Sequence, residues 1–370
     1  MKNEKKLLIV ESPTKARTIS KYLGSDYEVM ATVGHFRDLP TNKMGVDLND
    51  FTVDYVIDSK KKEIVSQLGK LSKEAGNIFL ASDPDREGEA IAWHVKWLLT
   101  EGQKGKIDAA KISRVSFHEI TKEAVEEALN KAREIDMNLV NAQQGRRVLD
   151  RVVGYSLSPV LWKKVRRGLS AGRVQSVAVR LICEREREIE AFKKEKYFKI
   201  GALFNKGVNF EAELIKIGDK SFIEKKKLNL FDGDFTYTKS LFTDEKEARG
   251  FVESLDKEFV VSQILGRKLR KEPVPAFTTS KLQQAGARRF GWSGKQTMTL
   301  AQRLYERGLI TYHRSDSLYL SDKAIKEFRD YIEKKYGSEY LSPKVRVYKN
   351  NSKNAQEAHE AIRPTQIGVI

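Results

Sequence analysis

Acidic side chains recur at alternate positions in the segment ASDPDREGE. Asp83, Asp85 and Glu87 stand at positions i, i+2 and i+4. In an extended segment these side chains point to one side of the backbone. Carboxylates crowded together repel one another unless a cation lies between them, and Mg²⁺ prefers oxygen ligands while keeping several waters. The spacing therefore predicts a magnesium site. A solvated acidic loop, in which Glu87 favours a helix start, is the alternative.

Another acidic residue follows the first apolar run of the chain. Glu11 comes directly after LLIV, which reads as a buried strand, and Lys15 lies one helical turn beyond it. Ligands of α/β sheets bind at the carboxyl ends of the strands. We therefore expect Glu11 to join Asp83, Asp85 and Glu87 in one crevice.

A tyrosine suited to nucleophilic chemistry lies in the segment GLITYHRSDS. Tyr312 can attack a phosphodiester in line, and the resulting phosphate ester keeps the bond energy for rejoining. Arg314, two positions further along an expected strand, points the same way and can neutralise the phosphate. The alternative is a core tyrosine, since the chain has 13 tyrosines.

These two motifs resemble a known enzyme family. Glu11 together with DPDREGE resembles the TOPRIM domain of topoisomerases, bacterial primases and some nucleases. ITYHRSDS resembles the active-site signature of type IA DNA topoisomerases, in which Tyr312 is the nucleophile and Arg314 its phosphate partner. Members of that family often have Met or Pro where His313 stands.

Further segments resemble the same family in the expected order: VGHFRDLP, RVSFHEIT, NAQQGRRVLDRVVGYSLSPVLW, LSAGRVQSVAVRLICERE, TLAQRLYERGLITY and AHEAIRPT. The DNA-binding residues that they suggest are His35, Arg37, Arg114, Arg146, Arg147, Arg151, Arg173, Gln175, Glu306 and His359. Arg147 and Arg151 are one turn apart on an expected helix, and Arg173 follows Gly172 at an expected helix start, where backbone N–H groups favour phosphate. Such residues could line a groove for single-stranded DNA. The alternatives are a salt-bridged helix face and, for the two histidines, a structural role.

The resemblance implies a complete reaction. Tyr312 would attack a DNA phosphorus and become linked to the 5′ phosphate, and Glu11 would give a proton to the departing 3′ oxygen. Lys15 and Arg314 would stabilise the phosphate, and Mg²⁺ would align the ends for rejoining. The outcome would be relaxation of negatively supercoiled DNA by a monomer. ATP would not be needed, in agreement with the lack of a G-x-x-x-x-G-K-[ST] motif.

Composition agrees with a polyanionic partner. The 370 residues carry a formal charge of +17. The single cysteine, Cys183, excludes disulfides and cysteine-based zinc sites within the chain, and its apolar surroundings predict a core position. The sequence has no apolar run long enough for a membrane span or a signal peptide, so we expect a cytoplasmic, nucleoid-associated protein.

The pattern of apolar residues predicts a multidomain α/β plus α+β protein. In a TOPRIM domain over residues 1–135, strands at 7–10, 27–33 and 78–81 alternate with helices at 13–23, 88–99 and 121–132, which predicts a Rossmann-like parallel sheet. A helical DNA-binding segment follows over 136–195, with expected breaks near 158–159 and 168–172.

Two further segments complete the expected organisation. Residues 196–272 read as antiparallel strands around a helix at 245–255, the first half of a β-rich arch segment. Residues 273–370 read as a winged-helix-like tyrosine domain, with helices at 280–290, 293–307 and 321–336 and a strand at 309–313. The family's chain continues well beyond this point, so we expect this sequence to be a piece of a longer protein.

Two other functions stay open at this stage. A TOPRIM nuclease or primase would need no covalent tyrosine. A non-catalytic DNA-binding fragment would show salt-dependent binding without a covalent adduct.

Overall fold

The computed structural model describes residues 5–102, 106–348 and 360–368. The chain divides into two compact units, one formed by Met1–Tyr155 with Glu272–Ile370 and the other by Ser156–Lys271. The first unit therefore contains both the acidic motif and the tyrosine motif. Each unit is described by itself below.

The first unit is built on a four-stranded parallel sheet in the order β2-β1-β5-β6. Its strands are β1 (Lys6–Val10), β2 (Tyr27–Ala31), β5 (Ile78–Leu80) and β6 (Ile112–Arg114). Leu8 of β1 lies between Val29 of β2 and Phe79 of β5. The chain runs from β1 to β2 on one side and then returns to β5 on the other. The carboxyl ends of β1 and β5 therefore form the point where the strand order reverses.

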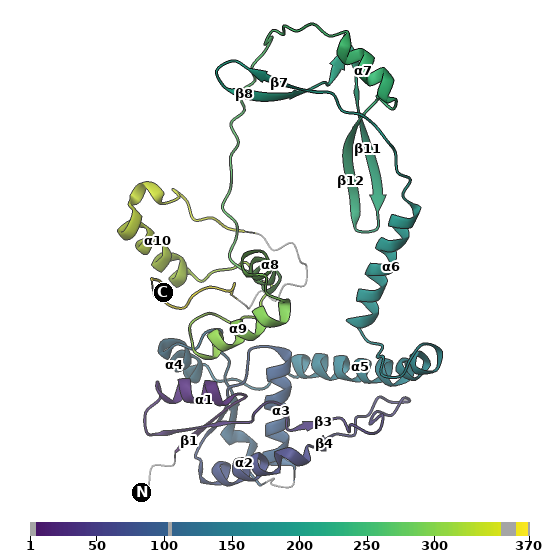
Figure 1. Cartoon of the computed structure of the whole chain (residues 1–370). Helices are drawn as coiled ribbons and strands as arrows, with labels where there is room; N and C mark the ends of the chain where they lie inside the picture. The colour runs from purple at the N-terminus through teal and green to yellow at the C-terminus, as the bar shows by residue number, and fades with distance from the viewer. Residues whose placement is uncertain (1–4, 103–105, 349–359, 369–370) are drawn as a thin grey trace. The chain divides into compact units, whose positions relative to one another are not determined.

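Helices cover both faces of this sheet (Figure 1). They are α1 (Pro13–Ser20), α2 (Lys62–Glu74), α3 (Arg86–Thr100) and α4 (Lys122–Asn130). Leu7 and Ile9 pack with α2 and α3, whereas Leu8 and Val10 pack with α1 and α4. The alternation follows from the two-residue period of a strand. The predicted parallel sheet is confirmed, although β6 and α2 were not expected.

Two helix starts place the acidic residues. Ser12 caps α1, and Pro13 occupies the first turn, where its missing N–H is not needed. Asp85 caps α3 by accepting a hydrogen bond from the Gly88 N–H. A Cβ at Gly88 would lie 2.1 Å from the Asp83 carbonyl oxygen, so only glycine allows α3 to start this close to the end of β5.

The C-terminal part of the first unit is mainly helical. It contains α8 (Thr279–Phe290), α9 (Gly294–Glu306) and α10 (Asp322–Tyr336), close to the predicted helices. The predicted strand at 309–313 is wrong: within the described residues, this segment has one isolated bridge, from Ile310 to Pro364. No antiparallel wing follows among residues 272–348 and 360–368, so the winged-helix expectation holds for the helices alone.

The remaining short elements of the first unit lie in its connections. A two-stranded antiparallel ribbon pairs β3 (Arg37–Asp38) with β4 (Val56–Ile57). The described residues also form the short 3₁₀ helices η1 (Ser59–Lys61), η2 (Ala109–Lys111) and η3 (Ser338–Tyr340).

The long helix α5 (Met137–Lys164) crosses the boundary between the units and continues through Pro159. The break predicted at 158–159 is therefore wrong, because a proline removes one backbone donor and often bends a helix without ending it. The second break is confirmed, since α6 (Gln175–Ala191) begins after a turn. Cys183 is exposed on α6, contrary to the expected core position.

The second unit continues with antiparallel pairs and one helix, as predicted. The elements are β7 (Gly201–Asn205), β8 (Asn209–Glu213), β9 (Lys216–Ile217), β10 (Lys220–Ser221), β11 (Ile223–Leu230), β12 (Gly233–Ser240) and α7 (Glu245–Glu253). Each strand pairs with its neighbour in sequence. Across the described residues, no helix has both the length and the apolar character needed to cross a membrane.

Candidate active site

A buried lysine joins the carboxyl ends of β1 and β5. The Lys15 ammonium donates to Glu11 Oε1 and, over 2.7 Å, to Asp83 Oδ1. The Asp83 backbone N–H also donates to Glu11 Oε2 at 3.1 Å. Lys15 has no exposed surface. The two carboxylates therefore share one enclosed cation, which lies at the point of the sheet where ligands are expected.

Burial and charge act against each other in this cluster. Burial raises the pKa of Glu11 to about 7, because the pull of Lys15 only partly offsets it and Asp83 adds to it. Burial alone would raise the pKa of Asp83 as well, but the attraction of Lys15 is stronger than this effect. The pKa of the Asp83 carboxyl is therefore lowered. The two carboxylates in turn outweigh burial at Lys15 and raise its pKa. The cluster therefore holds a stable Lys15–Asp83 pair beside a carboxyl, Glu11, that keeps a proton near neutral pH.

The phenol of Tyr312 lies next to this cluster. Its hydroxyl donates to Asp85 Oδ2 at 2.6 Å, while Oδ1 of the same carboxylate caps α3. Arg314 Nη1 lies 3.8 Å from Asp85 Oδ2. Tyr312 is only 1 % exposed, and burial, followed by Asp83 and Asp85, raises its pKa strongly. The tyrosine is thus held as a neutral phenol, and its proton is shared with Asp85.

The loop that carries Tyr312 is fixed from two sides. The Tyr312 N–H donates to the His118 carbonyl at 2.8 Å. On the other side, the Thr311 hydroxyl donates to the Ala361 carbonyl and accepts from the Arg363 N–H. The Tyr312 ring belongs to the same buried cluster as Leu8 and Val10 of β1. The candidate nucleophile is therefore anchored in the core of the parallel-sheet domain.

A cavity of 1240 Å³ opens beside these groups. Three arginines line it, Arg86, Arg146 and Arg314. All four predicted carboxylates line it as well: Glu11, Asp83, Asp85 and Glu87. A phosphate group placed in this cavity would lie close both to carboxyl groups that can carry a proton and to positively charged side chains.

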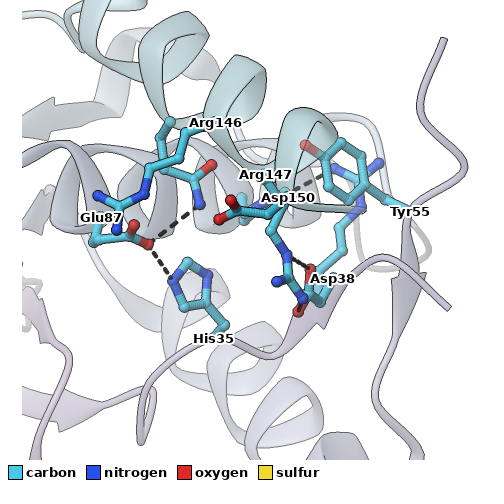
Figure 2. Close-up of a pocket in the computed structure, with 10 residues that line it drawn as sticks. His35, Asp38, Tyr55, Glu87, Arg146, Arg147 and Asp150 are labelled. Atoms are coloured by element: carbon cyan, nitrogen blue, oxygen red, sulfur yellow. Dashed lines mark hydrogen bonds and ion pairs between the residues drawn. The ribbon is translucent and has the colours of Figure 1, made fainter. Parts of the chain in front are cut away.

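A smaller polar cavity of 270 Å³ adjoins it, and Figure 2 shows its lining. His35 Nε2 lies 3.4 Å from Glu87 Oε2, and this hydrogen bond lowers the pKa of Glu87 to about 2. Arg147 makes two hydrogen bonds to Asp38, of 2.9 and 2.6 Å. His35, Glu87 and Arg146 line both cavities, so the two spaces share a wall of polar side chains.

Comparison with known proteins identifies the family. The model of the Toprim domain matches residues 6–120, and the model described as DNA topoisomerase matches residues 134–368, more than half of the chain. The chain belongs to the DNA topoisomerase family. DNA topoisomerase 1 of Rickettsia bellii is 47% identical over 99% of this chain, and that of Synechocystis is 46% identical over 97%.

A solved structure agrees with this assignment. Full-length topoisomerase I from Thermotoga maritima is similar with a TM-score of 0.73 and 39% identity, covering 97% of this chain and 55% of that one. This topoisomerase-family chain covers 45% of the Rickettsia bellii protein and 41% of the Synechocystis protein. It thus spans about half the length of these relatives.

The carboxylates of this topoisomerase-family chain are arranged differently from the sequence prediction. They do not point to one side of an extended segment, because Asp85 caps α3 and Glu87 lies in its first turn. Asp83 instead bonds Lys15, Asp85 bonds Tyr312, and Glu87 bonds His35. In the described part of the chain, no three Asp, Glu, His or Cys side chains converge on one point suited to a metal ion.

Three arginines predicted to bind DNA have structural contacts instead. Arg114 is fully buried, pairs with Glu89 at 2.9 Å and donates to four backbone carbonyls. Arg151 is 9% exposed and donates to the Pro40 and Lys43 carbonyls. Arg37 stacks 3.4 Å from the centre of the Trp97 ring. Arg114 is buried and all three of its side-chain nitrogens donate within the protein, which leaves it little capacity for a phosphate, whereas Arg151 is held through Nη1.

The other predicted DNA contacts lie in different places. Arg173 and Gln175 belong to the second unit, at the start of α6. Glu306 ends α9, where its carboxylate accepts from Gln302 at 3.2 Å. His359 lies outside the described residues.

The structure also adds two site residues that the sequence did not reveal. Asp38 holds Arg147 and was read only as part of a motif. Tyr305 lies against Lys15 and Tyr312, seven positions before the latter. Its helical spacing indicates a core residue, and only the fold brings it to the site.

Proposed function

We propose that this chain supplies the strand-cleaving and strand-rejoining chemistry of a type IA topoisomerase. The observation that carries the proposal is the placement of the Tyr312 phenol, bonded to Asp85 beside a cavity that Glu11, Asp83 and Arg314 also line. A nucleophile, a proton donor and cations thus surround one space large enough for a phosphodiester.

In the proposed step, Tyr312 Oη attacks a DNA phosphorus in line. The new O–P bond forms as the bond from phosphorus to the 3′ oxygen breaks, which leaves a 5′-phosphotyrosine and a 3′ hydroxyl. The phenol proton passes to Asp85, its hydrogen-bond acceptor. Glu11 gives its proton to the 3′ oxygen, a role suited to a carboxyl with a pKa of about 7. Rejoining is the reverse of these transfers.

Cations offset the charge that grows on the phosphate. The buried Lys15 is the nearest fixed cation to Glu11 and Asp83, and the half-exposed Arg314 reaches Asp85 from the tyrosine loop. Tyr312 is buried, so the strand can reach its Oη only when the loop around it opens, with the Tyr312–Asp85 hydrogen bond kept for the proton transfer. Cleavage therefore requires a local rearrangement of the tyrosine loop.

The donor set also suits a divalent cation. We assign Mg²⁺ to Asp83 and Asp85, with Glu87 or Glu11 beside them, because these oxygens line one cavity. Mg²⁺ keeps several waters and takes only one or two carboxylates, so it does not need three converged ligands. When bound, the ion would neutralise phosphate charge and align the ends for rejoining.

The proposed substrate is single-stranded DNA, exposed in negatively supercoiled duplexes. The charge of +17 and the positions of Arg146 and Arg314 on the cavity favour a phosphate backbone. Relaxation without ATP, by a cytoplasmic, nucleoid-associated monomer, would be the activity of the longer protein. The DNA topoisomerase 1 relatives support this proposal.

Covalent trapping tests the proposal directly. We expect the chain to form a denaturation-resistant adduct with a 3′-labelled single-stranded oligonucleotide, since the tyrosine retains the 5′ phosphate of the labelled part. Tyr312→Phe should form none while still binding the oligonucleotide. Cleavage that persists in Tyr312→Phe would favour a TOPRIM nuclease, and binding without any adduct from the native chain would favour a non-catalytic DNA-binding module.

A further inference from the structure

One buried aromatic ring touches both of the groups that are proposed to act on the phosphate. Tyr305, the penultimate residue of α9, is 1% exposed. The Lys15 ammonium lies 5.3 Å from the centre of its ring. On another side, its ring meets the Tyr312 ring edge-on, with centres 5.2 Å apart and planes at 69°. Tyr305 therefore contacts both a cation and the candidate nucleophile.

The contact with Lys15 has a physical consequence. An ammonium without water is stabilised by the negative face of an aromatic ring, and the same face fixes where the charge lies. Lys15 is fully buried, so its position depends on Glu11, Asp83 and the rings around it. Phe117 supplies a second ring, 5.6 Å from the ammonium.

The contact with Tyr312 acts on the nucleophile. Edge-to-face packing restricts the Tyr312 ring, which must keep its hydroxyl within reach of Asp85 while its oxygen approaches a phosphorus. The elements that carry these groups are also joined, since the Thr18 hydroxyl of α1 donates to the Glu306 carbonyl of α9 at 2.9 Å. A movement of α9 against α1 would therefore change the separation of Tyr305 from Lys15.

We propose that Tyr305 is a positioning residue for strand cleavage, whose ring sets the Lys15 ammonium and the Tyr312 phenol at a fixed separation. This inference rests on the proposed function of Tyr312. We assign the role to the ring, which makes both contacts; the Tyr305 hydroxyl lies 3.5 Å from the Phe117 carbonyl and is also close enough to Asp83 to feel its charge, so the hydroxyl is tested separately. The role also needs both contacts, which Phe117 does not make: in the described residues it forms no ring pair with Tyr312.

Three variants of the whole chain separate these effects. Tyr305→Leu removes the ring, and Tyr305→Phe keeps the ring but removes the hydroxyl. Phe79→Leu is the matched control, because it removes a ring that packs against the same buried cluster but pairs with Tyr27. Thermal unfolding shows which variants fold, and Tyr305→Met replaces Tyr305→Leu if the latter does not. The readout is the first-order rate of covalent adduct formation at saturating oligonucleotide, with the oligonucleotide Kd measured separately.

We expect Tyr305→Leu to lower the adduct rate at least tenfold with Kd changed less than twofold. Tyr305→Phe and Phe79→Leu should stay within threefold of the native rate. A native rate in Tyr305→Leu overturns the inference, and so does an equal loss in Phe79→Leu or in Tyr305→Phe. Absence of an adduct from the native chain is a different result, because it removes the proposed function itself.

Discussion

At the scale of single residues, His94 shows how burial sets a protonation state next to the polar cavities. Its ring lies 4.7 Å from the Trp93 ring and 4.9 Å from the Tyr55 ring, centre to centre. Arg37 Nη1 approaches its Nδ1 at 3.4 Å. Burial, followed by the charge of Arg37, lowers the pKa of His94 to about 3. His94 therefore stays neutral in the folded chain at any pH near neutrality.

This histidine predicts a dependence of stability on pH. Its ordinary pKa of 6.5 applies to the unfolded chain, so between pH 6.5 and about 3 only the unfolded chain binds the proton. The free energy of unfolding should therefore fall as pH drops below 6.5, by about 1.4 kcal/mol between pH 7.5 and 5.5 from this one group. Urea unfolding at the two pH values measures the loss.

His94→Gln is the comparison, because glutamine keeps a hydrogen-bond acceptor for Arg37 and does not titrate. The variant should lose about 1.4 kcal/mol less than the native chain over the same pH change. An identical pH dependence in both proteins would show that His94 gains its proton in the folded state.

Residue chemistry was predictable from the sequence only where a motif fixes several residue types together. The motif around Asp85 and the motif around Tyr312 were both recognised, and the fold joins them by a 2.6 Å hydrogen bond. Arg114 shows the limit. Nothing in RVSFHEIT reveals that its guanidinium is buried against Glu89, 25 positions earlier, because burial is a property of the assembled fold.

At the scale of elements, an arginine joins the tyrosine segment to the parallel-sheet domain. Arg363 Nη2 bonds Glu119 Oε2 at 3.0 Å, between β6 and α4, and its Nε bonds Glu360 at 2.8 Å. The backbone of Arg363 also bonds Thr311, next to the candidate nucleophile. The Glu119–Arg363 pair therefore helps to hold the Tyr312 loop against the domain that carries the acids.

Removing this pair should loosen the loop. Glu119→Gln takes one carboxylate partner away from Arg363. The interaction between the loop and the domain should weaken by about 1.5 kcal/mol, the contribution of a hydrogen bond to a charged group. The Tyr312 amide, which donates to the His118 carbonyl, should then exchange its hydrogen roughly tenfold faster. Hydrogen exchange followed by mass spectrometry of the peptide that contains Tyr312 measures this change.

Glu123→Gln is the matched control, since Glu123 is an exposed carboxylate in the first turn of α4. In this variant, the rate of hydrogen exchange at the Tyr312 amide should equal the rate in the native chain. Equal exchange in Glu119→Gln and the native chain would mean that the backbone bonds alone hold the loop.

Elements were predictable where one local signal dominated. The apolar run of β1, the Ser12-Pro13 start of α1 and the strand–helix alternation gave the parallel sheet. The segment at 309–313 looks like a strand by composition, yet Thr311 bonds residues 361 and 363, some 50 positions later, and a regular ladder does not form. Pro159 is the opposite case, because a strong local signal for a break was outweighed inside a 28-residue helix.

At the scale of the whole molecule, the distribution of charge matters more than its total. The chain carries +17, but many of its cations are already paired, as Arg114 is with Glu89 and Arg147 is with Asp38. Each such pair contributes nothing to the net charge, and its cation offers little to a phosphate backbone. Arg146 differs because it lines both polar cavities, so its position and not only its charge favours a DNA contact.

A salt titration separates position from total charge. Each cation that neutralises a phosphate of single-stranded DNA contributes about 0.7 to the slope of log K against log salt, since counterions are released there. Arg146→Gln should therefore reduce the magnitude of the slope by about 0.7, measured by fluorescence anisotropy with a labelled oligonucleotide. Lys70→Gln, on the exposed side of α2, removes the same single charge away from the cavities and should leave the slope unchanged. If both substitutions reduce the slope equally, binding depends on net charge alone, and the groove along the two cavities is not where the strand lies.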